Sequence, residues 1–505
     1  MMSRKFTIKR ILIFIIQLFI SGSYFAGMIL LTNFIHYQLI WLLLIFIYIL
    51  NVVTTFIIHA QNRNNQAKFS WLYLVLFVPI FGHVIFFVFG LDLKNKLAKT
   101  LDKFPEYKIS YYSDIPASII DSTNPVIQKM ILKRKTLMYD ANVEIVTEGY
   151  EFYKKLIKNL KQATKSIFIV TYIIKNSEIA KEITEILKQK QKEGVEIKWL
   201  IDDFGAIGKQ RKHINKLIKT NLLKIKIIGK IYYPFINFSS FTRNHQKFFI
   251  IDSKKVFSGG NNISDEYASL APKYGHWIDV NYIIQGPYIN SYVLHFFKLW
   301  HLIAKEKIEN LSYYLTYNTL DPNLINSRAL LVTDSPSYSY STIEDFLLLA
   351  LSNAKNSIKI ATPYFTLTSS LEKLLIVALK TGVQITIYFP GLADKRLVYK
   401  TGLNQLNRYI KFGLRVKIYK DHFLHSKMGL IDDEIAWIGT NNLDPRSMFS
   451  QYETVDILHG PIVDELRLLF ATYDKKSFNW HKVPNIERKY NKIENFFFNW
   501  IKTLI

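Results

Sequence analysis

Cysteine is absent from all 505 residues of this chain. Disulfide bonds and thiolate metal sites are therefore excluded, and cysteine usage gives no indication of the redox compartment. Acidic side chains are also scarce relative to basic ones, because 40 Asp and Glu residues face 65 Lys and Arg residues, for a formal net charge of +25. A charge of this sign suits an anionic partner, which is either a nucleic acid or the headgroups of a membrane.

Charged residues are missing from three long apolar segments near the N-terminus, at 11–31, 38–60 and 71–91. Each has about the 20 residues needed to cross a hydrocarbon core roughly 30 Å thick. We therefore expect residues 1–95 to form a membrane domain with two or three transmembrane helices, which predicts a multi-pass protein of the cell membrane. Pro79 interrupts the third segment, which also fits a re-entrant loop. Basic residues flank the segments on both sides, so their orientation stays open.

The rest of the chain alternates helical and strand patterns, which favours an α/β fold. Its second half repeats the first in order. The stretch ATKSIFIVTYI at 163–173 matches AKNSIKIATPYF at 354–365, and EGVEIKWLIDD at 193–203 matches TGVQITIYFPG at 381–391. This order predicts one duplicated α/β unit. The expected parts are a connector at 96–139, a first unit at 140–300, a linker at 301–325, a second unit at 326–480 and an amphipathic tail at 481–505, which suits a bilayer surface or a docked helix equally.

One polar pattern, His-x-Lys-x-x-x-x-Asp, occurs once in each half. It lies in RNHQKFFIID at 243–252 and again in FLHSKMGLID at 423–432. Its residues are His245, Lys247 and Asp252 in the first half and His425, Lys427 and Asp432 in the second. A glycine-rich turn follows each copy and leads to Asn262 or Asn442. One match would carry a real risk of chance, but two matches inside a repeat favour a functional site.

The pattern suits the chemistry of a phosphodiester. Residues two apart in a strand share a face, so each lysine is expected beside its histidine. If the halves face each other about a pseudo-twofold axis, two His, two Lys and two Asn converge. The lysines and amides would hold the non-bridging oxygens. One imidazole would attack phosphorus while the other protonates the departing alkoxide. No metal is required for this chemistry.

Carboxylates in the same region have other expected roles. A nucleophilic histidine needs a carboxylate on its other ring nitrogen, and Asp279 in HWID and Glu453 in SQYE are candidates. Asp252 and Asp432 also fit a structural salt bridge near a strand end. For the neighbouring pair Asp202 and Asp203 in IDDFG, at 201–205, we expect a strand-end role near the cleft rather than a metal site.

These residues resemble the phospholipase D superfamily, whose members carry two such motifs. Further stretches, among them GGNNISDEY, TPYF and FLHSKMGLIDDEIAWIGTNNLDPRS, are similar to bacterial cardiolipin synthases, and the likeness runs from about 68 to 475. The resemblance implies two duplicated phospholipase D-like α/β units facing each other, preceded by N-terminal transmembrane helices. It also implies a membrane phosphatidyltransferase that joins two phosphatidylglycerols into cardiolipin and releases glycerol. His245 would match the nucleophile that forms a phosphatidyl-histidine, and His425 the general acid/base.

The resemblance also sets the expected partners. They are phosphatidylglycerol and anionic membrane lipids rather than nucleic acid, and no cofactor is implied. Ile278 stands where the family commonly has Arg, which leaves the acceptor alcohol open. The alternatives are a phospholipase D-type hydrolase, a transphosphatidylase that uses another alcohol, a superfamily nuclease, and a membrane scaffold without activity. The products separate them, because transfer gives cardiolipin and glycerol whereas hydrolysis gives phosphatidic acid.

Overall fold

The computed structural model describes residues 37–483 and residue 494, except for nine short stretches. These stretches are 62–64, 92–95, 119–123, 135, 207–208, 220–222, 232–241, 271–275 and 339. The chain divides into two compact units, Met1–Leu91 and Asp92–Ile505. The expected apolar span at 11–31 and nearly all of the tail at 481–505 lie outside the described residues.

The first unit is built from apolar helices. Helix α2, Tyr37–Ala60, is followed by α3, Asn65–Phe77, then α4, Phe81–Ile85, and the π-helix η1, Phe86–Gly90. Among the described residues, one helix, at Leu39–Ala60, is long and apolar enough to cross a membrane. The expected third span is divided around Pro79 into shorter helices. The structure therefore supports one long span and a broken apolar segment after it.

The second unit contains one long mixed sheet. Its strands follow the order β18-β13-β12-β11-β15-β16-β17-β10-β1-β9-β7-β6-β2-β3-β4. The strands of the first half are β1 Tyr139–Val146, β2 Ser166–Thr171, β3 Glu196–Asp202, β4 Lys224–Ile228, β6 Phe248–Ile251, β7 Lys255–Gly259 and β9 Asn281–Gln285. Those of the second half are β10 Ser327–Asp334, β11 Ser357–Ala361, β12 Gln384–Phe389, β13 Arg415–Tyr419, β15 Met428–Ile431, β16 Ile435–Gly439, β17 Gln451–His459 and the edge strand β18 Ser477–Asn479.

The order of the strands reflects the repeat in the sequence. Read outward from the centre, β1-β9-β7-β6-β2-β3-β4 corresponds strand by strand to β10-β17-β16-β15-β11-β12-β13. Strands β1 and β10 pair antiparallel, with Tyr139 opposite Ala329. The two halves therefore join into one sheet, and equivalent strands lie at equivalent distances from this central pair.

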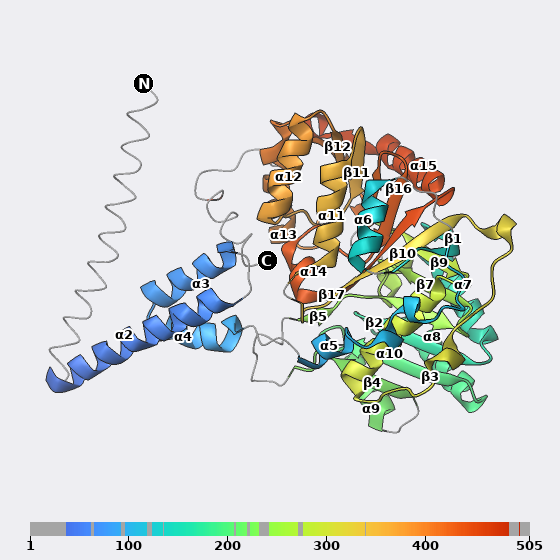
Figure 1. Ribbon diagram of the computed structural model, residues 1–505, viewed down its shortest axis with the longest axis horizontal. Coiled ribbons are helices and arrows are strands. Elements are labelled where there is room, and N and C mark those ends of the chain that lie inside the picture. Colours follow the sequence, from blue (N-terminus) through green and yellow to red (C-terminus); the bar gives the residue numbers. More distant parts are fainter. Residues whose placement is uncertain are drawn as a thin grey trace. The chain divides into compact units, whose positions relative to one another are not determined.

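Helices cover both faces of this sheet (Figure 1). Before the repeat come α5 Lys96–Leu101 and α6 Pro125–Arg134. In the first half they are α7 Gly149–Gln162, α8 Glu178–Lys192, α9 Lys209–Lys219 and α10 Ile289–Ala304. In the second half they are α11 Thr342–Asn353, α12 Ser369–Lys380, α13 Arg396–Ile410, α14 Pro445–Ser450 and α15 Ile462–Lys475. Because both faces are covered, strands such as β2 and β6 are buried along their whole length; β6 is the unbroken apolar run FFII, and β2 is apolar between Ser166 and Thr171.

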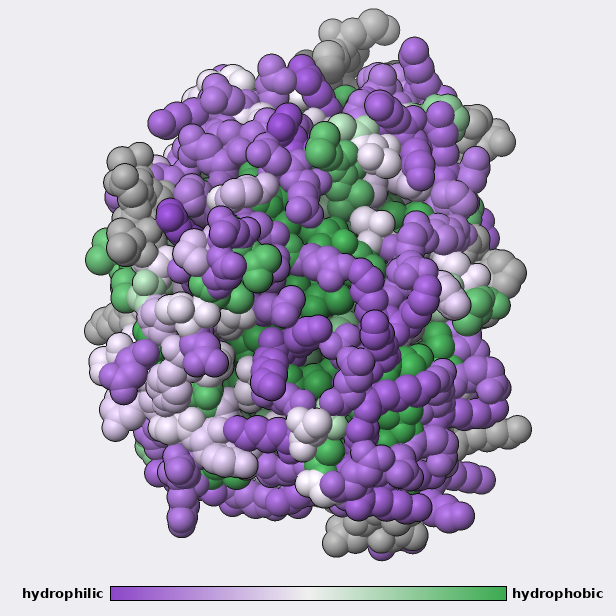
Figure 2. Space-filling model, turned by 90° about the vertical axis from the view of Figure 1, so that its right-hand side faces the viewer, coloured by the Kyte–Doolittle hydropathy of each residue, from purple (hydrophilic) through white to green (hydrophobic). Residues whose placement is uncertain are grey.

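Three hydrophobic cores hold the second unit together. One contains residues of α10 and α15 together with strand residues of both halves, so it crosses the central seam. The other two are separate, one under α7 to α9 and the other under α11 to α13. Figure 2 shows the face that lies on the right in Figure 1, where hydrophilic residues predominate and hydrophobic residues appear mainly in the gaps between them. The shared core fixes the two halves rigidly against each other.

Candidate active site

The His and Lys of each motif lie just before a strand, and the Asp follows the same strand. Strand β6 begins at Phe248 and β15 at Met428, so each His and Lys precedes the apolar run that forms the strand. The expectation that these residues lie in a strand was therefore wrong. The chain enters the sheet only after the lysine, because the residues before the histidine pair with the opposite half. The two-residue strands β5, Arg243–Asn244, and β14, Phe423–Leu424, come immediately before the histidines.

Each short strand pairs with the other half of the molecule. Strand β5 pairs parallel with β17, and the backbone N–H of His245 donates to the carbonyl of Tyr452 at 2.9 Å. Strand β14 pairs parallel with β8, Trp277–Ile278, and the N–H of His425 donates to the carbonyl of Ile278 at 2.7 Å. The backbone of each histidine is therefore held by the half that does not contain it.

The carboxylates are exchanged between the halves in the same way. The Nδ1 atom of His245 lies 3.0 Å from Glu453 Oε1, and Nδ1 of His425 lies 2.5 Å from Asp279 Oδ2. Glu453 comes directly after Tyr452, and Asp279 comes directly after Ile278. The same short segment therefore binds both the backbone and the ring of each histidine. All four side chains are buried, and the Nε2 atom of neither ring has a hydrogen-bond partner among the described residues. The two Nε2 atoms are therefore available to a substrate.

The two lysines are buried beside the histidines. Lys247 Nζ donates to the backbone carbonyl of His245 at 2.5 Å, and Lys427 Nζ does the same to His425 at 2.5 Å. Lys427 Nζ also lies 3.0 Å from Nδ1 of His425. Each lysine is only 3–4 % exposed. The two ammonium groups lie beside the imidazoles, where they can donate to the oxygens of an anionic ligand.

Burial shifts the proton affinities of the groups that surround His245. Burial and the nearby charges of Lys247 and Lys427 hold the pKa of His245 well below 6.5, so its ring is neutral at pH 7. Burial raises the pKa of Glu453 to about 7, with the two lysines opposing that rise. Burial also lowers the pKa of Lys247 to about 7. Near neutral pH, small changes in proton concentration therefore change the charge of this half of the site.

The surroundings of His425 differ. Burial and Lys427 lower the pKa of its imidazole to about 4, although Asp279 opposes this shift. Burial alone would raise the pKa of Asp279, but Lys427 and His425 outweigh it and hold that pKa below 3.8. Asp279 is thus ionised at neutral pH and can stabilise an imidazolium ring at His425. The two histidines have the same kind of contact with a carboxylate, but the pKa of Asp279 is lowered whereas that of Glu453 is raised.

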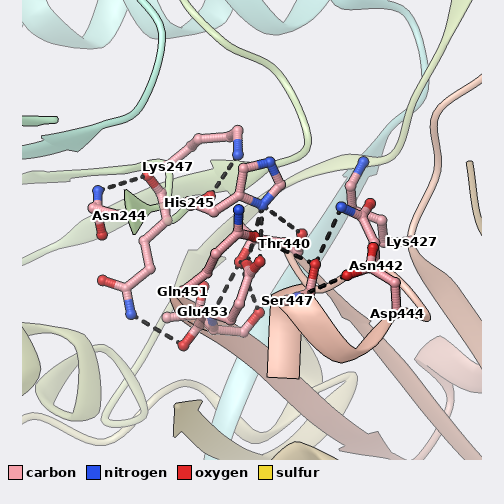
Figure 3. A network of polar contacts seen from close by, with 12 residues as sticks. Asn244, His245, Lys247, Lys427, Thr440, Asn442, Asp444, Ser447, Gln451 and Glu453 are labelled. Atoms are coloured by element: carbon pink, nitrogen blue, oxygen red, sulfur yellow. Dashed lines mark hydrogen bonds and ion pairs between the residues drawn. The ribbon is translucent and has the colours of Figure 1, made fainter. Parts of the chain in front are cut away.

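The two asparagines line the same region. Asn262 Nδ2 donates to the Tyr267 hydroxyl at 2.6 Å, and the Tyr267 ring lies 5.9 Å from that of His425. In Figure 3, Asn442 lies near Lys427, and its Nδ2 atom donates to Ser447 Oγ at 3.3 Å. Both amides bond to hydroxyl groups in this structure. They are placed to support the cluster around the lysines and histidines.

The motif aspartates lie at the other end of their strands. The Asp252 carboxylate accepts the backbone N–H groups of Thr164, Lys165 and Ser166 at 2.7–3.2 Å. The Asp432 carboxylate accepts those of Lys355, Asn356 and Ser357 at 2.7–2.8 Å in the equivalent place. Both aspartates have positive φ, at 53° and 51°. Each therefore fastens the turn after its strand to the start of the neighbouring strand, through backbone bonds instead of the suggested salt bridge.

Three supporting residues were missed from the sequence. Thr440 donates its hydroxyl to Glu453 at 2.5 Å, and its carbonyl lies 3.1 Å from Nδ1 of His245 (Figure 3). Gln246 Nε2 donates to the carbonyl of Glu453 at 3.0 Å. The ring of Tyr172 packs edge-on against His245, with centroids 5.2 Å apart. Thr440 lies inside the repeated glycine-rich turn, and this position in the repeat could have identified it from the sequence. The other two depend on contacts between distant segments.

Asp202 and Asp203 occupy the strand-end position that the sequence suggested. The Asp202 carboxylate accepts the N–H of Asn244 at 2.7 Å and pairs with buried Arg243 at 3.1 Å. Asp202 therefore holds both residues that precede His245. Asp203 pairs with Arg211 of α9 at 2.7 Å. Within the described part of the chain, no group of three or more His, Asp or Glu side chains has the arrangement of a metal site.

Comparisons with known proteins agree on one family. A family model described as a cardiolipin synthase, phospholipase D-like domain matches residues 156–300 and 347–473. The major cardiolipin synthase of Bacillus subtilis is 28 % identical over 432 residues, covering 82 % of this chain and 88 % of that protein. A cardiolipin synthase of Staphylococcus aureus is 30 % identical over 422 residues, covering 80 % and 84 %.

One solved structure has a similar fold. The crystal structure of a phosphatidylserine synthase from Haemophilus influenzae aligns with a TM-score of 0.59 at 16 % identity, and covers 75 % of this chain and all of that chain. At this identity the likeness concerns the fold alone.

Proposed function

Because this chain belongs to the cardiolipin synthase family of phospholipase D-like proteins, we propose that it joins two phosphatidylglycerol molecules into cardiolipin and releases glycerol. The observation that carries the proposal is the pair of buried imidazoles beside two buried lysines, each ring with a carboxylate on Nδ1 and with no partner on Nε2 in the described part of the chain. The enzyme is a phosphatidyltransferase that exchanges one phosphodiester for another, so the reaction needs no separate energy source.

The first step forms a covalent intermediate. Neutral His245 attacks phosphorus through Nε2 and breaks the bond to the glycerol oxygen, while His425 gives its Nε2 proton to that oxygen. The low pKa of His425 in the free enzyme reflects burial and Lys427. A bound phosphodiester anion offsets the lysine charge and raises this pKa, so the substrate itself favours the protonated acid. The lysines hold the non-bridging oxygens.

The second step reverses the roles. A hydroxyl of the second phosphatidylglycerol gives its proton to His425 and attacks phosphorus, and the bond to His245 breaks. Ionised Asp279 stabilises the imidazolium ring that His425 forms when it carries a proton in each step, whereas Glu453, which is ionised only above about pH 7, orients His245 through Nδ1 and stabilises a charged ring there less. This difference supports the assignment of nucleophile to His245. Asn262 and Asn442 support the phosphate-binding groups, and Asp252 and Asp432 brace the strands that carry them.

The apolar N-terminal unit would hold the enzyme in the membrane. We place α2 across the cell membrane, and we propose that segments 11–31 and 71–91 make the chain multi-pass. Phosphatidylglycerol is then present in the same bilayer as the enzyme.

Trapping of labelled phosphorus tests the proposal. The full chain, reconstituted with ³²P-labelled phosphatidylglycerol, is expected to give labelled cardiolipin and free glycerol. Quenching with denaturant during turnover is expected to trap label on His245 of the wild-type chain, and His245→Ala is expected to retain none. His425→Ala lacks the acid of the first step as well as the base of the second, so it is expected to form labelled protein and cardiolipin far more slowly than wild type. Phosphatidic acid as the main product would mean hydrolysis instead. Label on the His245→Ala protein would overturn the assignment of the nucleophile.

A further inference from the structure

Two loops at equivalent places in the repeat carry exposed apolar side chains. Phe204 follows strand β3 and is 47 % exposed, and Leu392 follows β12 and is 37 % exposed. The repeat aligns Gly194 with Gly382, which puts Phe204 and Leu392 at the same position of the two halves. A single exposed apolar side chain is ordinary. Exposure at both copies of one position, with different residues, indicates a shared role for the two loops.

Both loops are fastened beside the histidines. Phe204 N–H donates to the Asp202 carboxylate at 2.9 Å, and the same carboxylate holds the N–H of the residue before His245. Leu392 N–H donates to the carbonyl of His422, three residues before His425, at 3.3 Å. The two loops therefore flank the two catalytic segments, at the carboxyl ends of parallel strands where α/β sheets bind their ligands.

Glycine holds each loop tightly against the sheet. A Cβ atom on Gly205 would lie 1.5 Å from the carbonyl oxygen of Tyr172, and one on Gly391 would lie 2.1 Å from that of Tyr419. Only glycine permits so close an approach. Phe204 and Leu392 are the immediate neighbours of these glycines. The apolar side chains therefore stand on firmly supported turns and do not need to be buried for the turns to form.

The helices that follow the two loops begin with basic residues. Helix α9 begins KQRK and α13 begins RLVYK, and neither has an acidic residue in its first turn. Helices α7, α8, α11, α12 and α15 each have one or two, and α6 and α10 have none. Cations at a helix N-terminus oppose the helix dipole, so this placement works against local stability. Lys212, Lys395 and Arg396 are exposed, and Leu397 beside them is 46 % exposed.

We infer that these two loops and the starts of α9 and α13 dock on the surface of an anionic bilayer. Exposed apolar tips, each followed by a helix whose start carries exposed cations, have the chemistry that inserts side chains among acyl chains while Lys and Arg meet lipid phosphates. Docking would place the mouth of the site at the lipid surface, so that a headgroup enters without a lipid leaving the bilayer. The inference rests on the proposed function, which supplies phosphatidylglycerol as the substrate.

The absence of cysteine gives a direct test. Single variants Phe204→Cys and Leu392→Cys of the full chain are labelled with a fluorophore and reconstituted in vesicles containing phosphatidylglycerol and a lipid with a shallow quencher. The matched control is Leu468→Cys on α15, an apolar position that is 63 % exposed and belongs to neither loop. We expect quenching at both tips at least about threefold above the control. The paired change Lys395→Glu with Arg396→Glu is expected to reduce quenching at Leu392→Cys.

The outcomes separate this inference from the proposed function. Quenching needs no turnover, so His425→Ala combined with each label is expected to give the same result. Phe204→Asp with Leu392→Asp is expected to raise the KM for phosphatidylglycerol in bilayers about tenfold and to leave kcat unchanged. Quenching equal to that at Leu468→Cys would overturn the docking surface. So would contact between labels on two protein copies in place of lipid quenching, because the loops would then bind a second chain.

Discussion

At the residue scale, the two histidines differ in the carboxylate that each contacts. His245 faces Glu453, whose pKa burial raises to about 7, and His425 faces Asp279, which stays ionised. Lys247, with a pKa lowered to about 7, adds a cation that is lost just above neutral pH. A site with an almost symmetric geometry is therefore asymmetric in charge, and pH is the direct way to observe this.

The alkaline limb of the pH profile tests Lys247. Lysine binds phosphate in its charged form, so kcat/KM, which reports the free enzyme, is expected to fall as the pH rises through about 7. Lys247→Arg keeps its charge at all accessible pH values. Its maximum rate is expected to be lower, and its alkaline limb to move upward by at least about 1 pH unit. An unchanged limb in this variant would assign it to another group.

Glu453→Gln tests the carboxylate of the other half. The amide can still accept from Nδ1 of His245, but it carries no charge at any pH. We expect kcat to fall on the order of 10³-fold, as orienting and acid–base groups contribute in other enzymes. The acid limb caused by protonation of Glu453 near pH 7 is expected to disappear. Circular dichroism of the same sample serves as a control for folding, and a rate near that of wild type would contradict the role.

At the element scale, the motif aspartates stabilise turns. Asp252 joins the turn after β6 to the start of β2, and Asp432 does the same for β15 and β11. The aspartate is part of the repeated pattern because the strand that follows the histidine must end at a fixed place. The sheet then holds the lysine and histidine at its opposite end.

The variant Asp252→Ala distinguishes a structural role of Asp252 in the turn from a direct role in the reaction. It removes the acceptor of three backbone N–H groups, and leaving such groups unsatisfied costs about 1–3 kcal/mol in unfolding free energy. We expect a lower thermal midpoint, whereas activity per folded molecule at low temperature stays within about threefold of wild type. A loss of activity comparable with that of His425→Ala, in a protein of unchanged stability, would place Asp252 in the reaction instead.

At the scale of the whole molecule, a buried polar cluster joins the two halves. Asp456 on β17 accepts hydroxyl hydrogen bonds from Tyr282, Tyr288 and Tyr292 of the first half, at 2.5–2.7 Å. All four side chains are buried, and burial raises the pKa of Asp456 to about 6. Asp456 lies on the strand that also carries Glu453, so the integrity of the cluster bears on the site as well as on stability.

Asp456→Ala is expected to destabilise the whole catalytic unit. Three buried hydroxyls lose their acceptor, and the expected cost is about 3 kcal/mol or more in unfolding free energy. The matched control is Asp464→Ala, which removes an exposed ion pair on α15 and is expected to change stability by less than about 0.5 kcal/mol. Chemical denaturation of the full chain measures both. Equal effects of the two variants would mean that the cluster does not hold the halves together.

The same cluster predicts a direction of pH dependence. Because the folded-state pKa of Asp456 lies above the unfolded value of 3.8, the unfolded state releases this proton first as the pH rises. Its contribution therefore favours folding below about pH 4 and is lost as the pH rises towards about 6. Asp456→Asn, which cannot ionise, is expected to remove this slope from the denaturation midpoint measured against pH.

Local pattern in the sequence was sufficient to predict the α/β repeat and the two motifs, because strand periodicity and the spacing of His, Lys and Asp are properties of short segments. Asp279 and Glu453 were also found, as carboxylates of the right type. Their assignment was decided only by the tertiary structure, because β5 and β14 each cross to the other half and pair with its strands. For the same reason Asp252, whose partners are 86–88 residues away, could not be separated from the catalytic group by its spacing alone. The folded sheet determines which segments come into contact, and the spacing of residues within one segment does not predict those contacts.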